Sequence, residues 1–388
     1  MSIVTKCTRS LLTVGCWKLQ TGRMAHEAAK GDSVVEIKEM RRFMVDCMTT
    51  AGACESHAAQ LADVLAEGDK RGHYSHGLNR LDMYVRDIKT GSCNGRGEPR
   101  ILEERAATAW VDGNNLLGPV VGNFCIDLAI RKAKEAGIGW VVARGSNHYG
   151  IAGWYSMQAM RKGCLGISCT NTSPFMYPTR AAQPALGTNP LSVAVEGKSG
   201  DAFVLDMATT TVAVGKLELA SRKEVSVPNS WGVVKGGKES TDPKQILDGG
   251  GLLPLGGHEL SGGYKGYGLG SVVEIFCGIM AGARWGPNVR KWLSTGGEAN
   301  LGQCFVALDT SAFAPGFNER MQEFMDTLRG LPPSEPGKSV EVAGDMEKRH
   351  EQLVEKIGGI PYHPNQIKFA NDLAEKLAVE KPAVLSVL

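Results

Sequence analysis

The sequence predicts an α/β fold with interleaved lobes and helical N- and C-terminal parts. Between about residues 108 and 210, short apolar runs typical of buried strands alternate with longer runs of helical periodicity. Amphipathic helical patterns precede this region, and a helical tail follows it. No break in composition divides the chain, so we expect one unit over residues 33–388, with one lobe spanning roughly residues 110–310.

The expected elements follow in order along the chain. Amphipathic helices are expected in residues 33–52, 56–72 and 78–91, the last ending at Gly91. In the alternating region the expected strands are 108–113, 138–145, 165–171, 191–197 and 202–210, with helices at 120–137 and 150–163. A glycine-rich stretch after residue 226 leads to a core helix at 267–282, and a linker at 331–339 precedes the helical tail.

Composition excludes several classes of protein. With a formal net charge of +2 over 388 residues and its basic residues scattered, the chain does not resemble a nucleic-acid or membrane-surface protein. No apolar run reaches the ~18–20 residues of a membrane span. The ten cysteines contain no CxxC pair and no metal-ligand spacing, so we expect reduced, mostly buried thiols and no metal site.

The first residues differ from the rest of the chain. Residues 1–26 contain no acidic residue but carry Lys6, Arg9, Lys18 and Arg23 among hydroxyl and apolar residues. That composition fits a mitochondrial transit peptide, and it also fits a disordered extension. We therefore treat residues 1–32 as an extension outside the fold and expect a cytoplasmic protein, with the mitochondrial matrix as the alternative.

The stretch "RGHYSHGLNR", residues 71–80, concentrates two histidines and two arginines. If a helix begins near Tyr74, then His73, His76 and Arg80 lie on one helix face. An arginine fork binds a carboxylate through two parallel hydrogen bonds, and a histidine one turn away exchanges a proton near neutral pH. This pattern suits a 2-oxo or 2-hydroxy acid, whereas a solvated helix start with capping histidines is the structural alternative.

A second histidine motif, "GSNHYG", covers residues 145–150 between an expected strand and the next helix. Ligands of α/β proteins bind at such strand ends. His148 is flanked by small and amide residues that leave its ring accessible. A turn histidine bonded to a backbone carbonyl is the alternative interpretation.

Three further segments could contact a cofactor. The loop "SCTNTSPFMYPTRAAQPALGTNP" offers hydroxyl groups and backbone donors. In "LDMATTTVAVGK", Asp206 follows a strand and could accept from ribose hydroxyls or cap the next helix. In "GGHELSGGYKGYGLG", glycines, Lys265 and a helix starting near Tyr267 could cradle a phosphate, although glycine turns around a buried helix explain the same residues.

Two familiar nucleotide signatures are missing. No GxGxxG motif follows a strand, so a Rossmann site is unsupported. The segment "GVVKGGKE" has P-loop spacing, but Glu239 occupies the position of the magnesium-binding hydroxyl.

Taken in order, "RGHYSHGLNRL", "GSNHYGIAGWY", "NTSP…LGTNP", "LDMATT", "LPLGG…YKGYGL" and "GDMEKR" resemble the type-2 malate/L-lactate dehydrogenase family. The resemblance covers about residues 33–388. It implies an NAD- or NADP-dependent oxidoreductase with a non-Rossmann nicotinamide-binding fold, acting on a small 2-oxo or 2-hydroxy acid as a homodimer. Alternatives are an imino-acid or ureido-acid dehydrogenase of the same family, or a relative that binds the cofactor without catalysis.

The resemblance also implies roles for individual residues. His76 and His148 are the candidate proton carriers, and Arg80 holds the carboxylate. Ser75 and Tyr84 are assigned to substrate binding. The cofactor is expected to contact Thr172, Asp206, Met207, Ala208, Tyr264, Lys265, Gly344 and Asp345. The last two stand in "AGD" where the family has a "PGE" motif, a difference that affects how one end of the cofactor is held. Arg222 and Lys223 could bind a 2′-phosphate or simply face solvent.

Overall fold

A computed structural model describes residues 28–222, 224–292, 294 and 296–388. Its helices are α1 (Ile37–Ala51), α2 (Glu55–Lys70), α3 (Leu81–Lys89), α4 (Gly118–Ala136), α5 (Gly153–Arg161), α6 (Val214–Arg222), α7 (Pro243–Leu247), α8 (Gly263–Glu274), α9 (Phe317–Arg329), α10 (Asp345–Ile357) and α11 (Pro364–Leu377). Its strands are β1 (Ser33–Val35), β2 (Arg100–Glu104), β3 (Thr108–Asp112), β4 (Ile138–Ser146), β5 (Cys164–Thr170), β6 (Leu191–Glu196), β7 (Ala202–Met207), β8 (Gly232–Val233), β9 (Gly251–Leu252), β10 (Leu301–Asp309), β11 (Ile360–Tyr362) and β12 (Ser386–Val387). The expected alternation from β3 to β7 is confirmed.

The central sheet has seven strands in the order β2-β3-β4-β10-β5-β6-β7. Only β3 and β4 pair in parallel; the other neighbours are antiparallel. This topology differs from the parallel sheet of a doubly wound dinucleotide-binding fold, and it agrees with the absence of GxGxxG. The strand β10, at the centre of the sheet, is not among the strands expected from the sequence.

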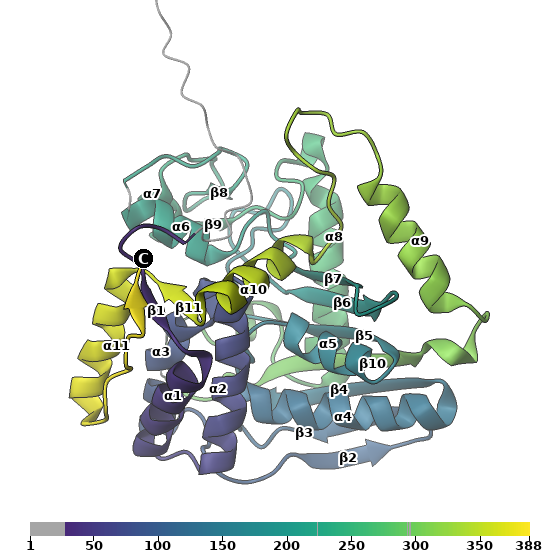
Figure 1. Cartoon of the computed structure of the whole chain (residues 1–388), viewed down its shortest axis with the longest axis horizontal. Coiled ribbons are helices and arrows are strands. Elements are labelled where there is room, and N and C mark those ends of the chain that lie inside the picture. Colours follow the sequence, from purple (N-terminus) through teal and green to yellow (C-terminus); the bar gives the residue numbers. More distant parts are fainter. Residues whose placement is uncertain (1–27, 223, 293, 295) are drawn as a thin grey trace, which may run out of the picture.

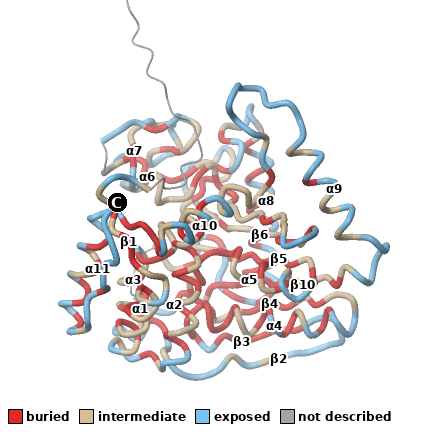
Figure 2. The backbone as a smooth tube through the Cα atoms, viewed as in Figure 1, coloured by how far each residue is buried: buried red, intermediate tan, exposed pale blue. Residues whose placement is uncertain are grey.

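Layers of helices cover both faces of this sheet (Figure 1). Because side chains alternate along a strand, Val141 of β4 belongs to the core beneath α4, whereas Val142 packs with Cys277 on the opposite face. That opposite face is covered by α8 and its continuation η4 (Ile275–Ile279), a π-helical turn. The central strands β4, β5 and β10 are mostly buried (red in Figure 2), whereas the edge strand β2 is largely exposed.

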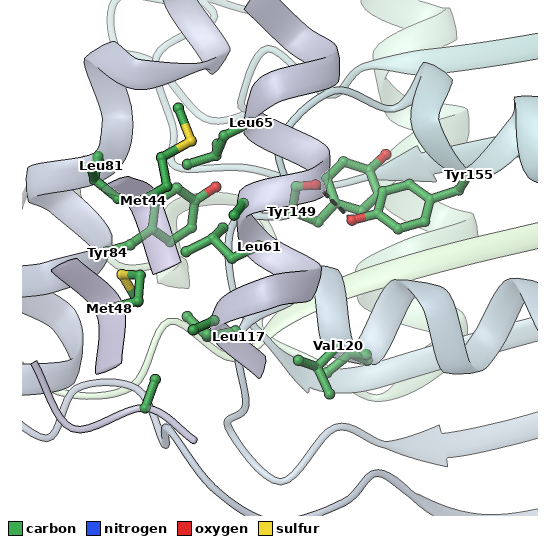
Figure 3. Packing of buried hydrophobic residues seen from close by; sticks show 14 of the residues in the cluster. Met44, Met48, Leu61, Leu65, Leu81, Tyr84, Leu117, Val120, Tyr149 and Tyr155 are labelled. Atoms are coloured by element: carbon green, nitrogen blue, oxygen red, sulfur yellow. Dashed lines mark hydrogen bonds between the residues drawn. The ribbon is translucent and has the colours of Figure 1, made fainter. Parts of the chain in front are cut away.

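A helical group formed by α1, α2, α3 and α11 stands at one end of the sheet (Figure 1). It shares one continuous apolar core with α4 and β4. In Figure 3, Leu61 and Leu65 of α2 lie between Met44 of α1 and the stacked rings of Tyr149 and Tyr155. This shared core fixes the helical group against the end of the sheet from which "GSNHYG" emerges.

Two boundaries differ from expectation. Residues 33–35, expected within the first helix, form β1 of a small sheet in the order β11-β1-β12. That strand pairs with residues more than 300 positions away, which local periodicity cannot reveal. The core helix begins at Gly263 rather than near Tyr267, so Tyr264 and Lys265 lie in its first turn. Within the described residues, no helix is long and apolar enough to cross a bilayer.

Candidate active site

Gly77 interrupts the "RGHYSHGLNR" segment. Instead of one helix from Tyr74, two 3₁₀ turns, η1 (Tyr74–His76) and η2 (Leu78–Arg80), precede α3. A Cβ atom at Gly77 would lie 1.9 Å from Oδ1 of the buried Asp69, whose Oδ2 accepts from the Leu78 N–H. The expected single helix face is therefore wrong, because the backbone must bend at Gly77 to pass over Asp69.

The bend separates the two histidines of this segment. His73 lies 3.7 Å from Glu347 of α10. His76 instead stacks on His148, with ring centroids 5.9 Å apart and an interplanar angle of 15°. The Nδ1 atom of His76 is 2.9 Å from the hydroxyl of Ser75. The structure thus stacks His76 on His148, whereas His73 lies beside Glu347.

Arg80 lies beside this histidine pair. Its Nε donates to the Ser75 carbonyl at 2.7 Å, and its terminal nitrogen lies 3.5 Å from Glu218 of α6. The guanidinium also covers the indole of Trp292, 5.3 Å from the ring centroid. The Arg80 side chain is 12 % exposed, so its charge is held in a site with little solvent screening.

His148 is fixed through its Nδ1 atom. The Gly150 N–H donates to this atom at 3.3 Å, and the Tyr84 hydroxyl lies 2.5 Å from it. Since a backbone N–H can only donate, Nδ1 accepts and the neutral ring carries its hydrogen on Nε2. Tyr84 therefore orients His148 so that Nε2 is the atom left for a ligand.

Burial dominates the electrostatics of this pair. It lowers the pKa of His148 to about 3, with the nearby Arg80 charge acting in the same direction. It also lowers the pKa of His76 well below its ordinary value, helped by His148 and Arg80. Burial raises the pKa of the Tyr84 hydroxyl, which therefore stays protonated. Both histidines are neutral until an anion enters.

Trp292 is a residue of this site that the sequence does not predict. Its ring lies 5.6 Å from that of His148, and it packs under Arg80. It belongs to a segment between the core helix and β10 that carries no recognisable motif. Only an isolated aromatic residue among polar ones could have drawn attention to it.

The residues expected at the cofactor lie on several separate segments. Thr172 follows β5; its N–H donates to Asn189 Oδ1 at 3.1 Å, and its hydroxyl lies 3.3 Å from that of Thr188. The Asn189 amide donates in turn to the buried Glu274 at 2.7 Å. Glu274 also accepts from Asn171 at 2.8 Å, so one carboxylate fixes both ends of this loop.

Asp206 lies near the end of β7, followed by the half-buried Met207 and Ala208. Its carboxylate accepts from the Gly153 N–H at 2.7 Å, and burial raises its pKa. It therefore caps α5, a helix that precedes it in the chain, rather than the helix that follows. That contact leaves its other carboxylate oxygen for a ligand.

The "AGD" turn packs against the same strand. The Val204 N–H of β7 donates to the Ala343 carbonyl at 2.9 Å, and Gly344 has φ of 103°. Asp345 pairs with Arg329 at 2.7 Å and accepts from the Val342 N–H at 2.9 Å. The Arg329 charge and that backbone N–H outweigh burial and lower the pKa of Asp345. Its carboxylate is thus engaged within the protein.

Tyr264 and Lys265 are exposed on the first turn of α8, with the Lys265 ammonium 5.9 Å from the Tyr264 ring centroid. Gly256, Gly257 and Gly262 all have positive φ around this helix start. A Cβ on Gly256 would lie 2.9 Å from the Gly262 carbonyl group, so the turn requires glycine. A cationic side chain at a glycine-rich helix N-terminus suits the phosphates of a nicotinamide cofactor. Neither candidate for binding a 2′-phosphate can be placed, because Lys223 and the side chain of Arg222 lie outside the described part of the structure.

The chain is similar to known dehydrogenases over most of its length. The family model for malate/L-lactate dehydrogenase matches residues 35–369. The malate dehydrogenase of Pyrococcus horikoshii is 38% identical over 341 residues, covering 87% of this chain and 94% of that protein. The L-sulfolactate dehydrogenase of Methanocaldococcus jannaschii is 36% identical over 82% of this chain and 90% of its own.

The fold agrees as well. The crystal structure of malate dehydrogenase from Entamoeba histolytica superposes with a TM-score of 0.86 at 32% identity, covering 91% of this chain and all of that one. The predicted family and fold class are therefore confirmed. The chain belongs to the malate/L-lactate dehydrogenase family and is a nicotinamide-dependent oxidoreductase of small hydroxy and oxo acids.

Proposed function

We propose that Arg80, His76 and His148 form the site at which this enzyme reduces the carbonyl of a 2-oxo acid and oxidises the corresponding 2-hydroxy acid. The observation that supports this most is the convergence of an arginine and two half-buried histidines: His76 stacks on His148, and His148 and Arg80 both lie at the Trp292 indole. Arginine supplies a carboxylate anchor, and a histidine supplies the proton that an alkoxide requires.

Arg80 anchors the carboxylate. Its Nε is bonded to the Ser75 carbonyl, which leaves terminal N–H groups for the substrate. Ser75 is itself packed beneath Gly215 of α6, where a Cβ would lie 2.9 Å from the Ser75 Cβ. The guanidinium position is therefore set before substrate arrives, and the reacting carbon is held next to the histidine pair.

His148 carries the proton, and His76 orients the substrate carbonyl. His148 lines the hollow beside Thr172, whereas His76 is turned toward Ser75. A bound carboxylate adds negative charge near a ring whose pKa burial has depressed, so binding favours the protonated imidazole. With substrate bound, His148 carries a hydrogen on both nitrogens, and its Nδ1–H donates to the Tyr84 oxygen. It gives its Nε2 proton to the developing alkoxide and is left as the neutral tautomer with hydrogen on Nδ1. In the reverse direction the bare Nε2 of that tautomer removes the hydroxyl proton. Tyr84 holds the ring during both steps.

The nicotinamide group, when bound, supplies or accepts the hydride. We propose that NAD or NADP contacts Thr172, Asp206, Met207, Ala208, Tyr264, Lys265, Gly344 and Asp345, within a cofactor lobe of roughly residues 110–310 extended by the "AGD" turn. Lys265 lies at the positive end of α8 and would hold phosphate. The free oxygen of Asp206 would accept from a ribose hydroxyl.

We also propose that the protein is a homodimer. The outer face of α8 and η4 exposes large apolar side chains at helical spacing, namely Tyr267, Val272, Ile275 and Ile279. Such a continuous apolar stripe is typical of an association surface. Sedimentation analysis of the protein should give twice the chain mass.

The direct test is the loss of reduced-nicotinamide absorbance by the purified protein. NADH and NADPH are supplied separately with oxaloacetate, pyruvate, other 2-oxo acids and a cyclic imino acid. We expect turnover of at least one 2-oxo acid. Turnover confined to the cyclic imino acid would overturn the substrate assignment, and cofactor binding without any turnover would favour a non-catalytic relative.

A further inference from the structure

A small hollow lies beside the histidine pair and is not accounted for by Arg80. Its lining joins α3, the loop after β5 and the segment before β10: Met83, Arg86, Asp87, His148, Thr172, Ser173, Arg290, Lys291, Trp292, Ser294, Ala299 and Leu301. His148, the proposed proton carrier, therefore faces a compartment whose walls combine apolar side chains, such as Met83 and Leu301, with several charged ones.

The charge of this lining is unbalanced. It contains three cations, Arg86, Arg290 and Lys291, and one anion, Asp87. Arg86 is paired with Asp82, which lies outside the lining, at 2.9 Å. Arg290 is the most enclosed of the three, with its side chain 14% exposed. An excess of positive charge near a buried ring favours an anionic ligand group.

Hydrogen bonds fix the position of Arg290 but do not occupy all of its N–H donors. Its NH2 donates to Asp87 at 3.2 Å, and its NH1 donates to the Gly297 carbonyl at 3.0 Å. The Ser173 hydroxyl donates to the Arg290 carbonyl at 2.7 Å, which fixes its backbone beside Thr172. A guanidinium has five N–H donors, so these contacts leave donors for a ligand.

Trp292 connects this hollow with Arg80. Its ring centroid lies 5.3 Å from the Arg80 guanidinium carbon and 5.6 Å from the centre of the His148 ring. Its indole Nε1 is buried and has no hydrogen-bond partner among the described residues. A buried N–H without a partner costs free energy unless a ligand accepts from it. Trp292 and Arg290 line the same hollow, so this donor is available to a ligand that also reaches Arg290.

We propose that Arg290 and the Trp292 indole bind a second anionic group of the substrate, carried one carbon beyond the reacting carbon. This inference rests on the proposed function, in which Arg80 takes the carboxylate next to that carbon. Both a carboxylate, as in oxaloacetate, and a sulfonate, as in sulfopyruvate, present the required acceptor oxygens. A methyl group in that place, as in pyruvate, leaves the N–H donors without an acceptor, which is the basis of selection.

Asp87 distinguishes a ligand-binding role of Arg290 from a purely structural one. If the pair only joins α3 to the segment before β10, Asp87→Asn and Arg290→Met should act alike. If Arg290 binds substrate, Asp87→Asn removes a competitor for its donors. The matched control is Arg284→Met, because Arg284 also donates to a backbone carbonyl, that of Glu298 at 3.1 Å, but lies outside the hollow.

The experiment measures kcat/KM of the full chain with oxaloacetate, sulfopyruvate and pyruvate, together with the KM of the cofactor. We expect Arg290→Met to raise the KM of its two-anion substrate at least about 30-fold, the loss expected for charge-assisted hydrogen bonds. Pyruvate turnover and the cofactor KM should stay within about twofold, since neither uses these donors. Asp87→Asn should leave that KM unchanged or lower it, and Arg284→Met should change none of these values. Arg290→Lys should recover part of the loss.

Three results would overturn the inference: a parallel loss on all substrates in Arg290→Met, the same loss in Asp87→Asn, or a wild-type preference for pyruvate that Arg290→Met leaves unchanged. The relative effect on oxaloacetate and sulfopyruvate identifies which anion the pocket accepts. Wild-type turnover of pyruvate without these effects would leave the proposed function intact. An absence of turnover with every 2-oxo acid would instead count against the proposed function itself.

Discussion

The substrate side and the cofactor side of the candidate site differ in how far their side chains are enclosed and hydrogen-bonded in the absence of ligand. On the substrate side, His76, His148 and Arg80 are enclosed and bonded before any ligand arrives. On the cofactor side, Tyr264 and Lys265 are exposed, and the Lys265 ammonium lies 5.9 Å from the Tyr264 ring centroid. The substrate side thus resembles a rigid catalytic centre, whereas the cofactor side resembles a set of separate surface anchors.

This difference has an energetic meaning. Burying two neutral histidines beside an arginine costs stability, which the surrounding core must offset. Exposed side chains such as Lys265 lower the stability of the fold little, and they form their interactions only when the ligand binds. Changes on the substrate side should therefore affect chemistry or folding strongly, and changes on the cofactor side should mainly affect affinity.

The largest effect is expected for Arg80→Met. It removes the carboxylate anchor while keeping much of the stem that packs on Trp292. We expect kcat/KM for the 2-oxo acid to fall about 10³-fold, in the range for loss of a positioning ion pair. Steady-state kinetics checks this, and Arg80→Lys should recover only part, since lysine lacks the fork. An unchanged KM and kcat would show that the carboxylate is held elsewhere.

Gly77→Ala tests the backbone bend that separates His73 from His76. The added Cβ would meet Asp69 Oδ1 at 1.9 Å, in a place where neither partner is exposed. We expect a loss of about 3 kcal/mol in the free energy of unfolding, as for an overpacked core. Urea unfolding measures it. Gly91→Ala is the comparison, because a Cβ there meets no atom within 4 Å, although its φ of +70° carries backbone strain. Equal losses in the two variants would exclude the clash as the cause.

Tyr84→Phe removes the hydroxyl that holds His148 and keeps the ring in the core. We expect turnover to fall about tenfold, because the imidazole loses one hydrogen bond worth roughly 1 kcal/mol and some orientation. The KM of the cofactor should not change. If the variant instead raises only the cofactor KM, Tyr84 does not act through His148.

Asp69 predicts a pH dependence of stability. Burial raises its pKa to about 7, above the ordinary value of 3.8. A carboxyl with a raised folded-state pKa contributes stability that is fully present below its unfolded pKa, and this contribution is lost as the pH rises through the folded value. In unfolding experiments between pH 4 and pH 7, Asp69→Asn should therefore lose less stability with rising pH than the wild type. Identical slopes would show that Asp69 does not titrate in this range.

The smallest effect is expected on the cofactor side. Lys265→Ala removes an exposed cation at the start of α8. We expect a rise of about three- to fivefold in the cofactor KM, as for an exposed phosphate contact, with kcat unchanged. The effect should shrink in high salt. A large loss of kcat would mean that the cofactor side also takes part in the chemistry.

The sequence predicts the parts of this molecule whose pattern is local. The alternation from β3 to β7 and the two histidine motifs could be found because periodicity and residue type mark them. The central strand β10 and the small sheet around β1 could not be found, since they pair with segments far away in the chain. Trp292 and Arg290 were missed for the same reason: only folding brings them to His148.

The bend at Gly77 is also set by tertiary packing and not by the local sequence pattern. From the sequence, helical spacing places His73, His76 and Arg80 on one face. The fold breaks that face because Asp69, eight residues earlier, occupies the space a continuous helix would need. The close approach of the buried Asp69 carboxyl group to Gly77 constrains the backbone there, and helical periodicity in the sequence cannot predict this approach.

The measurement that tests the account most directly is a single turnover of His148→Ala and His76→Ala, with cofactor affinity measured on the same samples. Enzyme, reduced nicotinamide and a 2-oxo acid are mixed in equal amounts, and the loss of absorbance is followed. We expect His148→Ala to slow hydride transfer at least about 100-fold, the usual contribution of a proton donor, with cofactor affinity within twofold of wild type. Wild-type rates in His148→Ala, or an equal loss of rate and cofactor affinity, would contradict the assignment of His148 as the proton carrier.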